Sequence, residues 1–319
     1  MNLKNSFSIF IKIIIGVISF WVIYSKLSSI PELREQSIVI LSHSATVILL
    51  VFSLGLMPIN WGIESYKWKS ITSLVEPVSY STALQSVFSG ICVGNIAPGR
   101  AMEFVAKVSF FKSQNRPSIT ILHFINGMFQ MLITVSVGMI CVAAKLINQQ
   151  GSNIIVYGTI VVGSLLILGF CWAITHVSFI QSKLRFIRWF KKMEANDFVK
   201  LPKTLIIKLV VLSVARYMVF TIQFYLIYQA FSSNTDFVSL FMSIAAYFVL
   251  TSLIPMISII EPAIRAAIAL FGFNTSPDPT LAVILASTVF CIINVVIPSI
   301  IGYIVILRKK MDIKSIHDF

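Results

Sequence analysis

Long apolar runs recur along the chain and predict helices that cross a membrane. Six of them cover about residues 7–25, 38–59, 119–145, 154–179, 204–230 and 280–307. A helix needs about 20 consecutive apolar residues to cross the hydrocarbon core of a bilayer. The run at 7–25 lacks a small-x-small cleavage site before the charged segment that follows, so we interpret it as a retained membrane helix rather than a signal peptide.

Two further apolar regions, 81–111 and 237–272, are interrupted by helix breakers and predict discontinuous helices. The breakers are Pro98 and Gly99 in the first region and Pro255 and Pro262 in the second. Each region then carries an acid followed four residues later by a base, Glu103 with Lys107 and Glu261 with Arg265. This spacing puts acid and base on one helix face, where they can pair.

The distribution of basic residues selects a topology for these regions. If both are re-entrant hairpins and the N-terminus is cytoplasmic, 17 lysines and arginines, including Lys67, lie inside, and only Lys26, Arg34 and Lys145 lie outside. If the first region crossed instead, the basic linker 181–203 would move outside, against the positive-inside rule. The hairpins then enter from opposite faces. We therefore predict an inverted repeat, with repeat one at about 38–147 and repeat two at about 204–308.

The fold class that follows is an all-α integral membrane protein with about six spanning helices and two re-entrant broken-helix hairpins in one domain over residues 1–319. Both termini are predicted to be cytoplasmic. Composition agrees, because 57% of the residues are hydrophobic and 12% charged, whereas a soluble domain carries about 25% charged residues. The net charge of +13 comes from clusters that flank the apolar runs, so we do not predict nucleic-acid binding.

Charged residues inside the predicted membrane segments define the candidate site. A charge at the bilayer centre costs about 2.5–3.5 kcal/mol on insertion scales, so such residues mark functional sites by default. The predicted substrate-binding residues are Arg100, Glu103, Lys107, Arg216, Glu261 and Arg265. Backbone N–H groups freed by the break before Arg100, together with Arg216 and Arg265, would bind an anion such as phosphate. The two glutamates would balance these charges, recognise a cationic head group or carry a coupling proton.

Other polar residues receive structural interpretations. The segment NWGIESYKWK, with Asn60, Trp61, Glu64, Trp68 and Lys69, is predicted to be an interfacial belt that closes the second span. Interhelical hydrogen bonds are predicted for Gln85, Asn95, His123, Asn126, Gln130, Gln223 and Asn294. The four cysteines form no CxxC pair and have no histidine at ligand spacing, so we predict neither a metal nor a cofactor.

The proline-interrupted motifs resemble those of the lysylphosphatidylglycerol synthetase transmembrane-region family, the flippase-like domain of bacterial aminoacyl-phosphatidylglycerol synthetases. The first motif is Pro98-Gly99-Arg100 followed by Glu103, and the second is Ile254-Pro255 followed by Glu261. This resemblance implies a bacterial cytoplasmic membrane protein that moves a phospholipid or polyprenyl-phosphate lipid between leaflets. Two departures are Met102, where the family usually has glycine, and MISII at 256–260, where it is usually glycine-rich.

Two alternative functions stay open at this stage. A membrane enzyme that acts on a lipid-linked phosphate would usually need clustered carboxylates for a metal, and the chain has twelve acids with no DxD or DD cluster at a membrane face. A non-catalytic subunit of a separate lipid-modifying synthase could use the basic linker 183–203 for docking. That linker is also compatible with an interfacial amphipathic helix or an ordinary loop. The cytoplasmic aminoacyl-transfer domain is absent from the sequence, and no P-loop motif is present.

Overall fold

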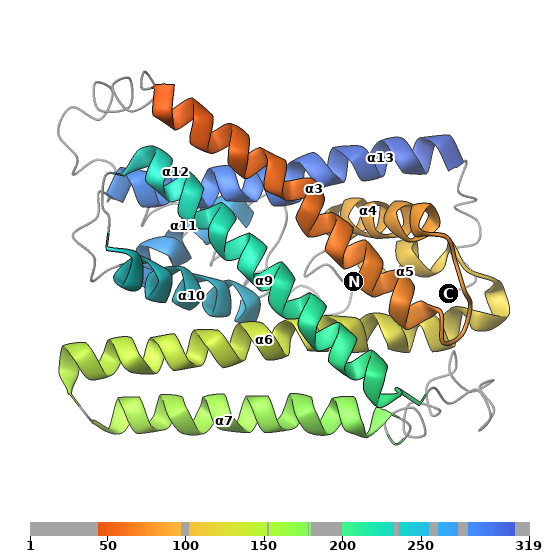
Figure 1. The fold of residues 1–319 in the computed structure, drawn as a ribbon, viewed down its shortest axis with the longest axis horizontal. Coiled ribbons are helices and arrows are strands. Elements are labelled where there is room, and N and C mark those ends of the chain that lie inside the picture. The colour runs from red at the N-terminus through yellow and green to blue at the C-terminus, as the bar shows by residue number, and fades with distance from the viewer. Residues whose placement is uncertain are drawn as a thin grey trace, which may run out of the picture.

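The computed structural model describes residues 44–96, 102–151, 153–177, 179, 200–232, 236–254, 261–273 and 280–309. Within these ranges the protein consists of helices and short connections, with no strand (Figure 1). The predicted helix at 7–25 and nearly all of the linker 181–203 lie outside the described residues. Pro98, Gly99, Arg100 and Pro255 also lie outside them.

Five of the six predicted membrane spans correspond to long apolar helices. They are α3 (Ser44–Thr72), α6 (Arg116–Gln150), α7 (Ile154–Thr175), α9 (Lys203–Phe231), and the continuous series α12 (Thr280–Cys291), η4 (Ile292–Val296) and α13 (Ile297–Lys309). Each is long and apolar enough to cross a membrane, which confirms a multi-pass membrane protein. Most of α7 exposes apolar side chains, as a lipid-facing helix would.

The two proline-interrupted regions each form a pair of helices. The first gives α4 (Tyr80–Ile96) and α5 (Glu103–Val108), and the second gives α10 (Phe237–Leu253) and α11 (Glu261–Gly272). The two helices of each pair pack against each other. Pro262 lies in the first described turn of α11, where proline is tolerated because a first-turn N–H has no partner within the helix.

The interfacial belt predicted at NWGIESYKWK is wrong. Helix α3 continues through Pro58 to Thr72, and most of this segment lies in the protein interior against α4, α6 and α9. Asn60 and Trp68 are fully buried, and Trp61 and Glu64 are each 6% exposed. Lys67, which the charge count placed at the cytoplasmic surface, is also fully buried. The mixture of tryptophan and charge that suggested a membrane interface instead belongs to a polar interior.

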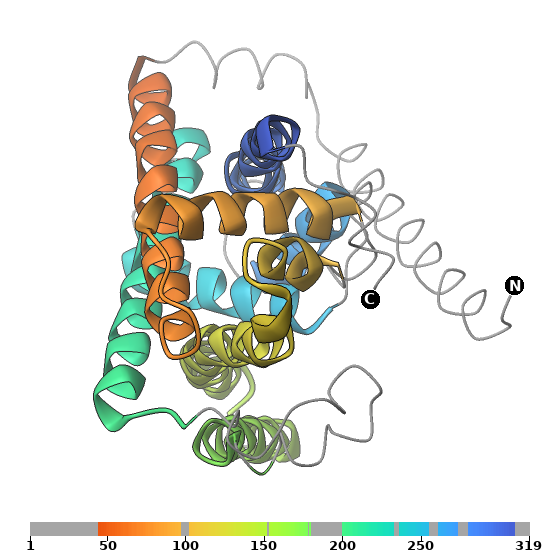
Figure 2. The same cartoon turned by 90° about the vertical axis from the view of Figure 1, so that its right-hand side faces the viewer.

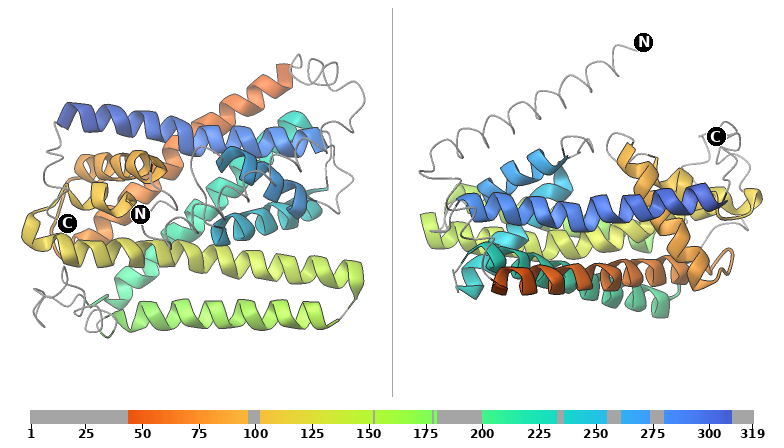
Figure 3. Two further views of the ribbon diagram at one scale, coloured as in Figure 1. Left: turned by 180° about the vertical axis from the view of Figure 1, so that it is seen from behind. Right: turned by 90° about the horizontal axis from the view of Figure 1, so that it is seen from above.

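Helix contacts recur in matching pairs around α3 and α9. These two helices form one edge of the molecule (Figure 2) and pack along each other. Helix α4 packs on α13, and α10 packs on α6, while α7 runs beside α6 at the periphery (Figure 3). Of the charged residues predicted from sequence, Glu103 and Lys107 lie on α5, Arg216 on α9, and Glu261 and Arg265 on α11.

Candidate functional site

Both predicted acid–base pairs are formed at the start of a short helix. Glu103 Oε1 lies 2.8 Å from Lys107 Nζ in α5, and Glu261 Oε1 lies 2.7 Å from Arg265 Nη2 in α11. In α11 the pair is reinforced by a hydrogen bond of 2.9 Å from Arg265 Nε to Glu261 Oε1. The spacing of four residues predicted from sequence is therefore confirmed as an ion pair in each helix.

Helix α5 lies close to α4 because glycine occupies the contact positions. A Cβ added at Gly90 would lie 2.6 Å from Lys107 Cγ, and one added at Gly94 would lie 2.9 Å from Glu103 Cβ. These glycines form a groove for the charged face of α5. On the same side, Ser86 Oγ donates a 3.0 Å hydrogen bond to the carbonyl of Lys107, and Trp68 Nε1 donates one of 3.0 Å to Ser86 Oγ.

Glu64 on α3 is the centre of a buried charge cluster that the sequence analysis did not anticipate. Its Oε1 accepts a 2.8 Å hydrogen bond from Asn126 Nδ2 and lies 4.0 Å from Lys107 Nζ. Its Oε2 lies 3.1 Å from Arg216 Nη1 and 3.7 Å from Lys67 Nζ. The carboxylate thus links α5, which carries the first predicted pair, to Arg216 on α9.

The guanidinium of Arg216 is held from several directions. Its Nε donates a 2.8 Å hydrogen bond to Asn60 Oδ1. Its Cζ lies 4.9 Å from the ring centroid of Trp61 and 5.1 Å from that of Phe220, at the distances of cation–π contacts. These contacts fix the orientation of Arg216. In the described part of the chain, it is the only charged side chain that contacts Glu64 and also lines the neighbouring cavity.

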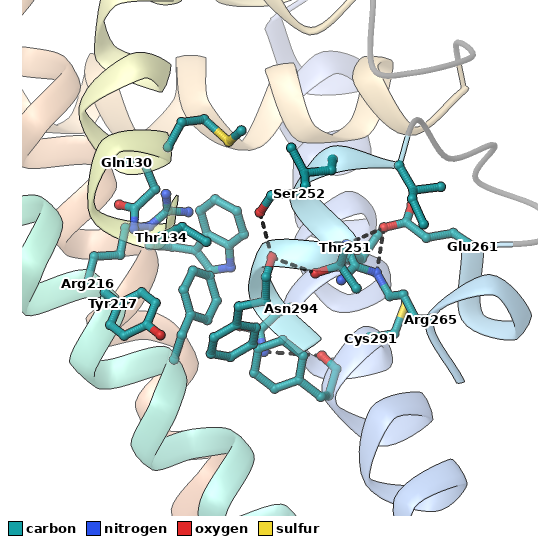
Figure 4. A pocket seen from close by; sticks show the side chains of 18 residues that line it. Gln130, Thr134, Arg216, Tyr217, Thr251, Ser252, Glu261, Arg265, Cys291 and Asn294 are labelled. Atoms are coloured by element: carbon teal, nitrogen blue, oxygen red, sulfur yellow. Dashed lines mark hydrogen bonds and ion pairs between the residues drawn. The ribbon is translucent and has the colours of Figure 1, made fainter. Parts of the chain in front are cut away.

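A cavity of about 720 Å³ opens between α3, α6, α9, α10, α11, α12 and η4. Arg216 and Gln130 lie on one side of it, and the Glu261–Arg265 pair lies on the other (Figure 4). Neutral polar side chains, including Thr134, Thr251, Ser252 and Asn294, alternate with aromatic ones, including Trp61, Phe220 and Phe248. A ligand in this cavity would meet charge, hydroxyl groups and apolar rings together.

The structure divides the six predicted substrate-binding residues between two adjoining groups. Arg216, Glu261 and Arg265 line the cavity, whereas Glu103 and Lys107 belong to the buried cluster around Glu64. Arg100 lies outside the described residues. The sequence analysis missed Asn60, Glu64 and Lys67, although their i, i+4, i+7 spacing places them on one helix face. If the predicted helix is extended past Pro58 to Thr72, the three residues form one polar face.

Several predicted hydrogen-bonding residues do connect helices. Asn126 bonds Glu64, and Asn294 Nδ2 donates a 2.9 Å hydrogen bond to Gln223 Oε1. Gln223 Nε2 in turn donates a 2.8 Å bond to the carbonyl of Ser53, which joins α9 to α3. Among the described residues, no group of three or more histidine, cysteine or acidic side chains is placed to hold a metal ion.

No protein-family model matches this sequence, and no curated protein sequence matches it significantly. The interpretation of the site consequently depends on its own geometry.

Proposed function

We propose that this protein is a lipid flippase that moves a phosphate-bearing lipid between the leaflets of the bacterial cytoplasmic membrane. The main support is the cavity that combines Arg216 and Arg265 with aromatic walls inside a bundle of apolar helices. Charge retained in such surroundings is costly and is usually functional. Arginine is well suited to phosphate, because its planar guanidinium can donate two parallel hydrogen bonds to phosphate oxygens.

The dimensions and lining of the cavity favour a lipid head group. Its volume of about 720 Å³ falls within the range of about 300–1,000 Å³ that is usual for small-molecule sites. Hydroxyl groups of Thr251 and Ser252 can hydrogen-bond the polar part of a head group, and the rings of Phe220 and Phe248 can contact the start of an acyl chain. The Glu261 carboxylate offsets the positive charge of Arg265 on its side of the cavity when no ligand is present.

The paired helices support an alternating-access mechanism. The paired packing of α4 on α13 and of α10 on α6 fits an inverted repeat. In this proposal the α4–α5 and α10–α11 pairs are re-entrant hairpins that enter from opposite faces, with both termini cytoplasmic. Inverted repeats with broken helices place substrate sites at the repeat interface. Movement would be passive or driven by an ion gradient.

A reconstitution assay tests the proposal. Purified protein in liposomes should make a fluorescent head-group-labelled phospholipid in the inner leaflet accessible to an external quencher. We expect Arg216→Gln and Arg265→Gln to reduce this rate by about tenfold or more, since one lost charged hydrogen bond costs about 1.5–3 kcal/mol. Arg308→Gln is the matched control, because Arg308 is exposed at the end of α13. Equal rates in protein-free and protein-containing liposomes would disprove the flippase function.

A further inference from the structure

Arg216 retains hydrogen-bonding capacity for a ligand. An arginine side chain has five N–H donors. Within the described residues, Nε bonds Asn60 and Nη1 faces Glu64, so three N–H groups are left for the cavity that Arg216 lines. The rings of Trp61 and Phe220 hold the guanidinium in place, which lowers the entropy cost of binding an oxyanion.

The two oxygens of Glu64 are held very differently. Oε1 accepts a well-formed hydrogen bond from Asn126. Oε2 lies 3.1 Å from Arg216 Nη1 but receives no aligned hydrogen bond in the described part of the chain, although it is buried. The contact between Glu64 and Arg216 is thus an ion pair without directional bonding. A ligand oxyanion that aligns with the guanidinium can displace Oε2.

Lys67 is the partner available to the displaced oxygen. Its side chain is fully buried, and its Nζ makes no hydrogen bond among the described residues. The Nζ lies 3.7 Å from Glu64 Oε2, so a movement of about 1 Å would bring the two atoms to hydrogen-bond distance. A buried ammonium without a hydrogen bond is costly. Among the described residues, no acid other than Glu64 lies within ion-pair distance of Lys67 Nζ.

We propose that Arg216 is the phosphate-binding group of the cavity and that Glu64 occupies it in the empty protein, moving to Lys67 when phosphate binds. This inference rests on the proposed function and names the site within it. Oε1 stays on Asn126 while Oε2 exchanges Arg216 for Lys67. The exchange keeps a cation beside the Glu64 carboxylate in both states, and it returns the guanidinium to Glu64 when the lipid leaves, which prevents the arginine from retaining its substrate.

Calorimetric titration tests the exchange, with dihexanoyl phosphatidic acid added to purified full-length protein in phosphatidylcholine nanodiscs. Glu64→Gln removes the competing carboxylate, so binding should tighten by about tenfold, equivalent to about 1.4 kcal/mol. Lys67→Met leaves the displaced carboxylate without its partner, so binding should weaken by a similar factor. Lys69→Met, at a partly exposed lysine on the same helix, is the control and should leave affinity unchanged.

The double variant separates exchange from a general field effect. If the charges act only through their field, the two changes are additive, and Glu64→Gln/Lys67→Met should bind as wild type does. If Glu64 and Lys67 act by exchange, Lys67 has no role once Glu64 is neutral, and the double variant should bind as tightly as Glu64→Gln. Additive behaviour, or weaker binding in both single variants, would overturn the exchange.

Ligand controls distinguish failure of this inference from failure of the proposed function. Dihexanoylglycerol, which lacks phosphate, should not bind, and inorganic phosphate should compete weakly with the lipid, with the same order of affinities among the variants. If wild-type protein binds inorganic phosphate more tightly than the lipid, or binds no phosphatidic acid, the lipid assignment is wrong. Tight wild-type binding of phosphatidic acid that is insensitive to Glu64→Gln would overturn the exchange alone.

Discussion

Glu64 in α3 and Gln223 in α9 each accept a hydrogen bond from the side-chain amide of an asparagine. Asn126 Nδ2 donates to Glu64 Oε1 over 2.8 Å, and Asn294 Nδ2 donates to Gln223 Oε1 over 2.9 Å. The two helices pack along each other. The two contacts have the same form, but Glu64 is charged and Gln223 is neutral. The acid is therefore found only on α3, where it lies beside Arg216.

This difference predicts that Gln223 cannot be replaced by glutamate. Gln223 Nε2 donates to the carbonyl of Ser53 over 2.8 Å, and Gln223→Glu would put a carboxylate oxygen against that carbonyl in a fully buried place. An unpaired buried charge costs about 3–5 kcal/mol. We expect Gln223→Glu to lower the thermal unfolding temperature in detergent well below that of Gln223→Met, which removes the same hydrogen bonds without adding charge. Equal unfolding temperatures would contradict the argument.

The sequence specified the long helices well because the membrane imposes a simple rule on their length and composition. Residues 204–230 were predicted as a span and α9 covers Lys203–Phe231. The end of α3 was predicted less well, because Pro58 and the polar residues after it look like the edge of a membrane. Only tertiary packing against α4, α6 and α9 reveals that Glu64 and Lys67 point inward.

Alanine substitutions at Gly90, where α4 meets α5, and at Gly127, which faces open space, should change the stability in opposite directions. Gly90→Ala would place a Cβ 2.6 Å from Lys107 Cγ, so Lys107 must move, and overpacking of this kind costs about 1–3 kcal/mol. Gly127→Ala in α6 meets nothing within 4 Å and should stabilise the helix by about 0.5–1 kcal/mol. Thermal unfolding of the two variants beside wild type measures the difference. A Gly90→Ala variant as stable as Gly127→Ala would show that Lys107 is loosely held.

Lys145 illustrates a role that charge counting could not predict. The charge count used Lys145 only as one of three basic residues on the outer face. In the structure its Nζ donates to Ser243 Oγ over 2.9 Å and to the carbonyl of Gly272 over 2.7 Å. Gly272 is the last residue of α11, and a cation there is favoured by the helix dipole and by unpaired carbonyls. The lysine consequently joins α6 to α10 and α11.

From these contacts we predict that Lys145→Met destabilises the protein by about 1–3 kcal/mol, the cost of leaving a buried polar partner unpaired. Lys112→Met should change stability little, because the Lys112 side chain is exposed. Limited proteolysis of both variants, followed over time, should give faster cleavage in the α11–α12 connection of Lys145→Met only. Identical cleavage rates would show that the end of α11 is held by other contacts.

The proposed inverted repeat, in which the two hairpins enter from opposite faces, predicts a pattern of cysteine labelling in intact cells. After replacement of Cys92, Cys141, Cys171 and Cys291, single cysteines are introduced as Ser113→Cys, Lys200→Cys and Ser233→Cys. Ser113 and Lys200 are exposed, and α6 and α7 between them run side by side in opposite directions (Figure 3), so both should lie in the cytoplasm. An impermeant thiol reagent should label only Ser233→Cys until the cells are permeabilised. If Ser113→Cys and Ser233→Cys react together, α6, α7 and α9 do not make the three crossings that place the two hairpins on opposite faces, and the inverted repeat is excluded.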